Sequence, residues 1–256
     1  MRHNHQEQNS IAAKLFKYAE EGDENKLLKL INEGGVNPNV FNEASGDTAL
    51  MIAVKNGHKE VVERLLEFGA DPKASNVQSG ETALMYASIG GHAEIVELLL
   101  EFGADPNSVS KNMQTALKYA AREGWEELSS LLLKAGAEVD KADQFDATPL
   151  MYASLRGHKE LVSLLLKAGA DPNKVNKQGQ TAEQMALKNN RSEIIDILSA
   201  RASEVLNEPA FHNLQSTITD VAVEERRGPN PSVATIDSQN QAAQANRNKN
   251  NQGAER

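Results

Sequence analysis

A segment of about 25 residues recurs along the chain at a nearly constant spacing, and this repeat constrains the fold more than any other feature. Four copies align without internal gaps, from Thr48–Pro72 to Thr148–Pro172, and a fifth, less regular copy begins at Thr181. The threonines that open the copies, at positions 48, 82, 115, 148 and 181, are separated by 34, 33, 33 and 33 residues. A fixed period of this length indicates a repeat protein, in which each unit contacts only its neighbours.

Each copy has the pattern of a helix, a turn, a second helix and a loop. In the second full copy, Thr82 can cap a first helix by accepting a backbone N–H that would otherwise be unpaired. The glycines at 90 and 91 end that helix, because glycine suits a left-handed closing residue. Apolar residues then dominate Ile95–Leu100, which predicts a second helix covered on two sides. Pro106 prevents that helix from resuming.

The predicted helices are only about nine or ten residues long, which is too short for an isolated helix to be stable in water. Each unit must therefore be covered by its neighbours, so the copies are expected to stack. A small residue recurs at one register, where we expect adjacent helices to approach most closely: Ala53, Ala87, Ala120, Ala153 and Ala186.

The shared pattern, T-[AP]-L-x-x-A followed by G-H and then L-L-L-x-x-G-A-D-P-N, resembles the ankyrin repeat. The resemblance extends from Ser10 to Ala200. It implies an all-α ankyrin-repeat solenoid of stacked antiparallel helix pairs with projecting hairpin loops and a concave face, and a usual role in protein–protein recognition. The histidine that the family carries after T-P-L is replaced here, and we expect apolar contacts to substitute for its hydrogen bonds between repeats. The replacing residues are Met51, Met85, Lys118, Met151 and Gln184.

The periodicity also predicts the domain organisation. The ankyrin-repeat domain is expected at residues 10–200, between a disordered N-terminus (1–9) and a weakly structured segment (201–227), the latter with a short helix around Asn213–Glu225. Residues 228–256 are rich in Pro, Asn and Gln, which predicts a disordered tail. The six modules are an N-terminal cap at 10–42, four repeats at 43–76, 77–109, 110–142 and 143–175, and a C-terminal cap at 176–200.

Composition excludes several other classes of protein. The formal net charge is −9 and the pI about 5.3, which disfavours binding to nucleic acid because phosphate neutralisation needs clustered cations. The chain has no cysteine and no apolar run near the roughly 20 residues of a membrane helix. Residues 1–9 are polar, unlike a secretory signal. We therefore expect a cytoplasmic monomer, in the host cytosol if it is a bacterial effector, without membrane or nucleic-acid partners.

No pattern of residues indicates an active site, a cofactor or a metal site. His58, His92 and His158 share one register after a glycine, so they are interpreted as structural rings at the turn between helices. Nucleophile elbows, phosphate loops and zinc motifs are missing from the sequence. The alternative, an enzyme with its activity in the C-terminal segment, is disfavoured because about 55 residues of low hydrophobicity are too few for a catalytic domain.

Two further sets of residues recur in register. Tyr86, Tyr119 and Tyr152 are interpreted as framework that packs between first helices. The methionines that follow T-A-L or T-P-L are interpreted as core, although methionine also suits an adaptable binding surface.

The positions that differ between copies are the candidates for binding. In the ankyrin family, partner contacts come mainly from the hairpin tips and the exposed end of the first helix. At these positions Ile89, Phe145 and Leu155 are apolar where the resemblance implies exposure, and arginines flank them, as in an interface hot spot. Trp125, the one tryptophan, replaces the turn histidine and either packs on the neighbouring turn or contacts the partner. The candidate residues are Ile89, Lys111, Arg122, Glu123, Trp125, Phe145, Leu155, Arg156, Gln178 and Lys188.

The sequence thus predicts a non-enzymatic adaptor or scaffold that holds a partner protein on its concave ankyrin face. An inhibitor, or a secreted bacterial effector that occludes a host protein, would use the same surface and remains an alternative.

Overall fold

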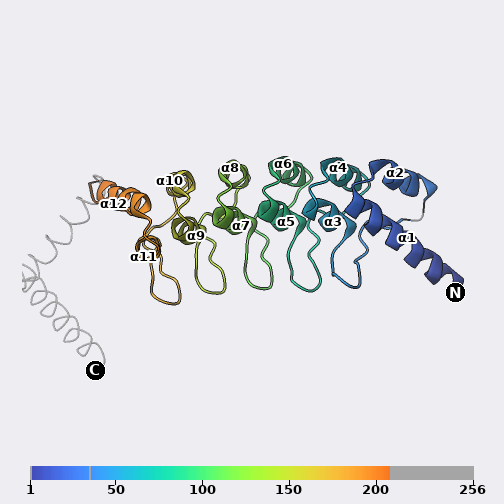
Figure 1. Ribbon diagram of the computed structural model, residues 1–256, viewed down its shortest axis with the longest axis horizontal. Coiled ribbons are helices and arrows are strands. Elements are labelled where there is room, and N and C mark those ends of the chain that lie inside the picture. Colours follow the sequence, from blue (N-terminus) through green and yellow to red (C-terminus); the bar gives the residue numbers. More distant parts are fainter. Residues whose placement is uncertain (1, 35, 208–256) are drawn as a thin grey trace, which may run out of the picture. The chain divides into compact units, whose positions relative to one another are not determined.

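The computed structural model describes residues 2–34 and 36–207, and within these ranges the chain forms twelve helices in six consecutive pairs (Figure 1). The helices are α1 (Arg2–Glu21), α2 (Glu24–Glu33), α3 (Ala49–Lys55), α4 (Lys59–Glu67), α5 (Ala83–Gly90), α6 (Ala93–Glu101), α7 (Ala116–Glu123), α8 (Glu126–Lys134), α9 (Pro149–Arg156), α10 (Lys159–Lys167), α11 (Ala182–Lys188) and α12 (Ser192–Asn207). The predicted all-α repeat fold is confirmed.

The pairs stack in sequence order within the unit Met1–Ala200. Each odd-numbered helix contacts the next odd-numbered one, from α1 to α11, and the even-numbered helices from α2 to α10 form a second layer (Figure 1). The loops between repeats project to one side of the odd-numbered layer (Figure 1). Contacts therefore join only neighbours in the row, as a period of 33 residues predicts.

Threonine side chains start the first helix of each full repeat. The hydroxyl of Thr82 accepts the N–H of Met85 at 3.4 Å, and Thr148 accepts that of Met151 at the same distance. Thr181 forms a complete capping box, because Gln184 also reaches back to the threonine amide at 3.0 Å. The recurring threonine is therefore explained by an orphan amide in the first turn of the helix.

The core is a continuous seam between repeats and has no single centre. The alanines of the recurring register, at 53, 87, 120, 153 and 186, are all fully buried, as a register of close helix packing requires. Leucines of the even-numbered helices, such as Leu65, Leu99, Leu132 and Leu165, are also fully buried. A seam built from small and aliphatic side chains needs few aromatic residues, in keeping with an aromatic content of 4%.

The projecting loops are held by one side chain each and by bonds to the next loop. Asn76 Oδ1 accepts the amides of Gln78 and Ser79 at 2.8 and 2.9 Å. The amide of Lys111 donates to the Ser79 carbonyl of the preceding loop at 3.0 Å. Because each loop is tied both to itself and to its neighbour, the loop tips are ordered parts of the repeat array.

The N-terminus differs from the disorder expected there. Residues 1–9 were expected to be disordered, but α1 begins at Arg2 and continues without a break to Glu21. The segment contains no glycine or proline, and Leu15 and Ala19 of the same helix are fully buried against the repeat. Once those turns are fixed by packing, helix propagation toward the N-terminus adds one hydrogen bond per residue without a new nucleation step.

At the other end, α12 extends to Asn207, so its last turns lie in the segment 201–227 that was expected to be weakly structured. Residues 208–256 lie outside the described residues. That range includes both the helix predicted around Asn213–Glu225 and the tail predicted at 228–256.

Candidate functional site

The candidate residues form two lines on the side of the molecule that carries the loops. One line follows the C-terminal ends of the odd-numbered helices and comprises Ile89, Arg122, Glu123, Leu155, Arg156 and Lys188. The other follows the loop tips and comprises Lys111, Phe145 and Gln178. We call the surface formed by these helix ends and loops the hairpin face.

Contacts between repeats bring each line together. Along the helix line, α5, α7, α9 and α11 pack in sequence. Along the loop line, Lys111 Nζ donates to the Val77 carbonyl at 3.0 Å, and the Lys177 amide donates to the Phe145 carbonyl at 2.9 Å. Residues separated by a full repeat in the sequence are therefore neighbours in space.

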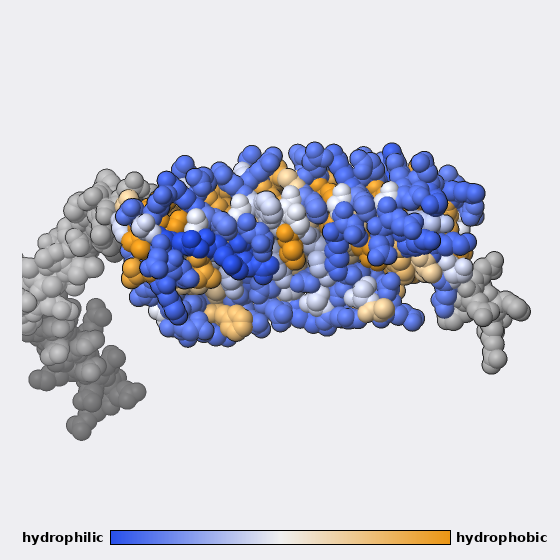
Figure 2. All heavy atoms as spheres, viewed as in Figure 1, coloured by the Kyte–Doolittle hydropathy of each residue, from blue (hydrophilic) through white to orange (hydrophobic). Residues whose placement is uncertain are grey.

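The predicted exposure holds for two of the three apolar candidates. Ile89 is 36% exposed and Phe145 is 49% exposed. Leu155 was expected to be exposed but is half-buried, because it ends α9 where that helix packs against α11. Its carbonyl also accepts Nε–H of Arg191 at 3.4 Å from the following turn. On the face drawn in Figure 2, single apolar side chains interrupt a mainly hydrophilic surface along the loop edge.

A row of tyrosines shares the hairpin face, and the sequence interpretation of these residues as framework is confirmed. Tyr119 is buried, and Tyr86 and Tyr152 pack against the core. The hydroxyl of Tyr119 donates to Glu81 Oε1 at 2.7 Å, and that of Tyr152 donates to Asp143 Oδ2 at 2.9 Å. Burial and the bond to Asp143 raise the pKa of Tyr152 to about 12, so the ring remains neutral at physiological pH.

Cations lie over these rings. Lys55 Nζ is 3.9 Å from the centre of the Tyr86 ring and 2.7 Å from Asp47 Oδ2. The guanidinium carbon of Arg122 is 5.2 Å from the centre of the Tyr119 ring. Such contacts are attractive because the face of an aromatic ring is electron-rich. Through Lys55 these contacts join the end of α3 to the Asp47 carboxylate in the loop before it and to the Tyr86 ring of the next repeat.

Two positions of this register hold no methionine, the exposed Gln184 and the buried Lys118, and the buried lysine corrects the expectation of apolar contact between repeats. Met51, Met85 and Met151 are buried, as predicted. Lys118 occupies the same register in α7 and is also buried, with Nζ 2.8 Å from Asp143 Oδ2 in the next loop. The side chains of Lys118 and Asp143 are 2% and 0% exposed.

Asp143 also differs from the residues at the equivalent position of the other loops. Equivalent loop positions carry uncharged side chains, such as Asn76, whose Oδ1 binds loop amides as Asp143 Oδ1 binds those of Phe145 and Ala147 at 2.8 and 3.0 Å. A lysine and an aspartate thus replace neutral residues at two positions that touch. The pair of departures was visible in the sequence, but the contact between the two positions was not.

The electrostatic environment of the pair favours the ionised aspartate. Burial acts to raise the pKa of Asp143, but bonds from Lys118, from the two loop amides and from Tyr152 together hold it below its usual value. Burial lowers the pKa of the Lys118 ammonium, and the nearby carboxylate opposes this shift. The carboxylate therefore carries a full set of donors inside the protein.

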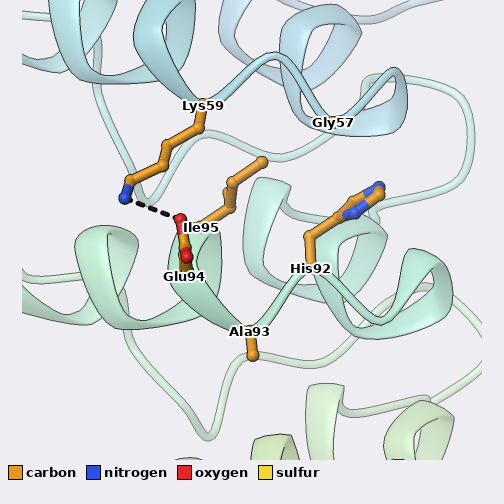
Figure 3. Close-up of a pocket in the computed structure, with 6 residues that line it drawn as sticks. All are labelled: Gly57, Lys59, His92, Ala93, Glu94 and Ile95. Atoms are coloured by element: carbon orange, nitrogen blue, oxygen red, sulfur yellow. Dashed lines mark hydrogen bonds and ion pairs between the residues drawn. The ribbon is translucent and has the colours of Figure 1, made fainter.

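The histidines at the turns between helices are structural, as predicted. Nε2–H of His58 donates to the Glu20 carbonyl at 3.0 Å, and that of His158 donates to the Arg122 carbonyl at 3.0 Å. Each bond joins one turn to the preceding repeat. The ring of His92 lies against Gly57, beside the ion pair of Lys59 with Glu94 at 2.7 Å (Figure 3). These residues line a shallow cavity at the turns between the helices of two consecutive pairs.

Trp125 takes the histidine position in the module of α7 and α8, which is the fourth repeat when the N-terminal cap is counted as the first, and it packs on the turn before it. A Cβ atom on Gly91 would lie 2.7 Å from Cε2 of the indole, so the ring occupies the space that the glycine leaves open. Gly91 also has a φ of 72°, which a side chain would disfavour. Because 41% of Trp125 is exposed, packing on the turn still leaves a large apolar surface.

Among the described residues, no three His, Cys, Asp or Glu side chains are grouped so as to hold a metal ion. In the same part of the chain, no helix is both long enough and apolar enough to cross a bilayer.

The comparison with protein families matches this architecture. A family model described as ankyrin repeats (3 copies) matches residues 15–110 and 117–209. These two ranges include each candidate residue of the hairpin face apart from Lys111, which falls between them. A comparison with curated proteins gave no match.

Proposed function

Because the chain belongs to the ankyrin-repeat family, whose members are generally protein–protein interaction modules, we propose that it is a non-enzymatic adaptor or scaffold that binds a partner protein through the hairpin face. The observation that carries the proposal is the exposure of Phe145 on an ordered loop tip.

Phe145 is held in place by its backbone. Its amide donates to Asp143 Oδ1 at 2.8 Å, and its carbonyl accepts the Lys177 amide at 2.9 Å. An aromatic side chain on a fixed backbone loses little conformational freedom when a partner covers it, so most of its buried area contributes to affinity. Ile89 adds a second exposed apolar side chain at the end of α5. Apolar anchors with polar groups around them are typical of interface hot spots.

The even-numbered layer is a poorer candidate, because many of its charges are already paired between repeats. Arg64 Nε lies 2.9 Å from Glu24, and Lys159 Nζ lies 3.1 Å from Glu193. A partner that binds this layer would have to displace these ion pairs before it could use the same charges.

The test compares two double variants in affinity purification from the native cell. Phe145→Ala/Arg156→Ala alters the hairpin face, and Phe102→Ala/Lys134→Ala is the matched control on the even-numbered layer, where Phe102 is 42% exposed. Leu155 is left unchanged because it is half-buried, so alanine there would also affect packing.

We expect the hairpin-face variant to lose its captured partners by about tenfold or more, and the control to retain them, with equal helicity and melting temperature in both. Capture of the same partners by both variants at wild-type levels would place the binding surface elsewhere.

A further inference from the structure

The hairpin face carries a cluster of cations from α7 to α11, although the whole chain has a net charge of −9. We call this cluster the basic end of the hairpin face. Its members lie at helix ends and in the loops of consecutive repeats, and they are Lys111, Arg122, Arg156, Lys177 and Lys188. Two exposed carboxylates share this part of the face, Glu123 and Asp146.

The cations of the basic end differ in how far they are already engaged. Nε of Arg122 lies 2.7 Å from Glu123 Oε1, and Lys111 Nζ binds the Val77 carbonyl. The exposed side chains of Arg156 and Lys188, by contrast, make no hydrogen bond or ion pair with other described residues. Their donors are therefore available to a bound partner without the loss of an internal contact.

The other end of the same face is different. Lys55 stands at the register of Arg122 and Lys188, but its ammonium is paired with the buried carboxylate of Asp47 and covers the Tyr86 ring. The next residue at that register is Ile89, and the loop before its helix carries Glu81. Unpaired positive charge is thus concentrated in the last three repeats.

We propose that the basic end binds an acidic peptide segment of the partner that also carries an apolar side chain, an inference that rests on the proposed function. Carboxylates of the segment pair with Arg156 and Lys188, while its apolar side chain packs on Phe145. Arginine suits this role because its planar donors match a carboxylate in two bonds.

The apolar contribution favours a protein segment over nucleic acid. Phe145 on the loop line and Ile89 on the helix line offer exposed apolar surface to a partner. A phosphate backbone would make little use of that surface, because it gains most of its affinity from cations. The carboxylates of Glu123 and Asp146 would also repel neighbouring phosphates at fixed spacing, but a peptide can place neutral residues opposite them.

The experiment selects peptides with the full-length chain. A displayed library of random peptides of about 12 residues, long enough to extend about 40 Å, is enriched on the immobilised wild type. Non-specific attraction to a chain of charge −9 would enrich basic peptides, so enrichment of Asp and Glu together with Leu, Phe or Trp is the expected and informative result.

Two charge-reversal variants then locate the binding. Arg156→Glu/Lys188→Glu should weaken the selected peptides about 30-fold, and raising the salt should weaken the wild type in the same direction. Lys134→Glu/Lys167→Glu makes the same change in net charge at exposed lysines of α8 and α10, and it should change affinity by less than about twofold.

The outcomes separate the inference from the proposed function. Selected peptides that are neutral or basic, and that Phe145→Ala still weakens, would overturn the acidic segment and leave the hairpin face as the binding surface. Peptides that neither Phe145→Ala nor Arg156→Glu/Lys188→Glu weakens would overturn both. The acidic segment would also be overturned if no peptide is enriched, or if labelled single-stranded RNA binds through Arg156 and Lys188 while acidic peptides do not.

Discussion

The third and fourth repeats have the same backbone plan but differ in the interior of their first helices. Met85 of α5 and Lys118 of α7 occupy one register, and both are buried. The third repeat fills the position with an unbranched apolar chain. The fourth repeat fills it with an ammonium group, which forms an ion pair with Asp143 from the following loop. The same site thus accepts a charge only because the contacting position changed with it.

The buried ion pair is not expected to make the protein much more stable than a buried methionine at the same position would. Desolvation of two charges offsets most of their attraction, so an ion pair and a well-packed apolar residue can contribute similar stability. Removal of one partner is different, because the remaining charge stays buried without compensation. Variants that remove or add one charge of the pair test this asymmetry.

Asp143→Ala should lower the free energy of unfolding by about 4 kcal/mol. The substitution leaves the buried Lys118 ammonium without a counterion, and it removes the acceptor of two loop amides and of the Tyr152 hydroxyl. Urea denaturation followed by circular dichroism and Trp125 fluorescence measures the loss. Asn176→Ala is the control, since it removes a loop acceptor at the same register but leaves no buried charge, and it should cost about 2 kcal/mol. Equal losses would mean that the buried charge is unimportant.

Met85→Lys should lower the free energy of unfolding by about 3 kcal/mol, because it places an ammonium in the third repeat without a carboxylate to meet it. Ser110 stands at the loop register of Asp143, so Ser110→Asp added to this variant should restore about 1 kcal/mol or more. If the added aspartate destabilises the variant further, the two registers do not meet in the third repeat as they do in the fourth.

The double variant Lys118→Met/Asp143→Asn replaces the pair by residues found at the same registers elsewhere in the array, such as Met151 and Asn176. It should unfold within about 1 kcal/mol of the wild type, whereas Lys118→Met alone should lose about 3 kcal/mol. A double-mutant cycle from urea denaturation measures the coupling. Losses that simply add would show that Lys118 and Asp143 act independently.

The same double variant should differ from the wild type in acid. The pKa of Asp143 is lowered in the folded protein from an ordinary value of 3.8, so its contribution is fully present above that value and is lost as the pH falls through the folded pKa. Wild-type stability should therefore decrease more steeply below about pH 4 than that of the double variant. Parallel curves of unfolding free energy against pH would contradict this expectation.

Much of the fold was predictable because its determinants are local. Thr82 caps a helix, glycine closes it and Ala87 lies in the seam, and each of these roles recurs wherever the pattern does. The exposure of Ile89 and Phe145 followed from the same registers. The candidate face was predicted less completely, since the burial of Leu155 depends on how closely α11 covers the end of α9.

The contact of Lys118 with Asp143 could not be predicted from the repeat pattern. Each residue departs from its own register, which is visible in the sequence, but 25 positions separate them. The α1 extension back to Arg2 was missed for a related reason, because helix propagation from a packed segment depends on packing that the polar residues at the N-terminus do not reveal.

The repeat, its six helix pairs and the residues that cap and close them can all be read from the chain alone, because they depend on hydrogen bonds and apolar periodicity within one period. The tertiary structure alone decided which side chains of different repeats meet. It buried a lysine beside an aspartate, covered half of Leu155 and left Arg156 and Lys188 without a partner among the described residues. The reason is physical: desolvation and charge pairing depend on neighbours in space, and stacking brings residues a full period apart into contact.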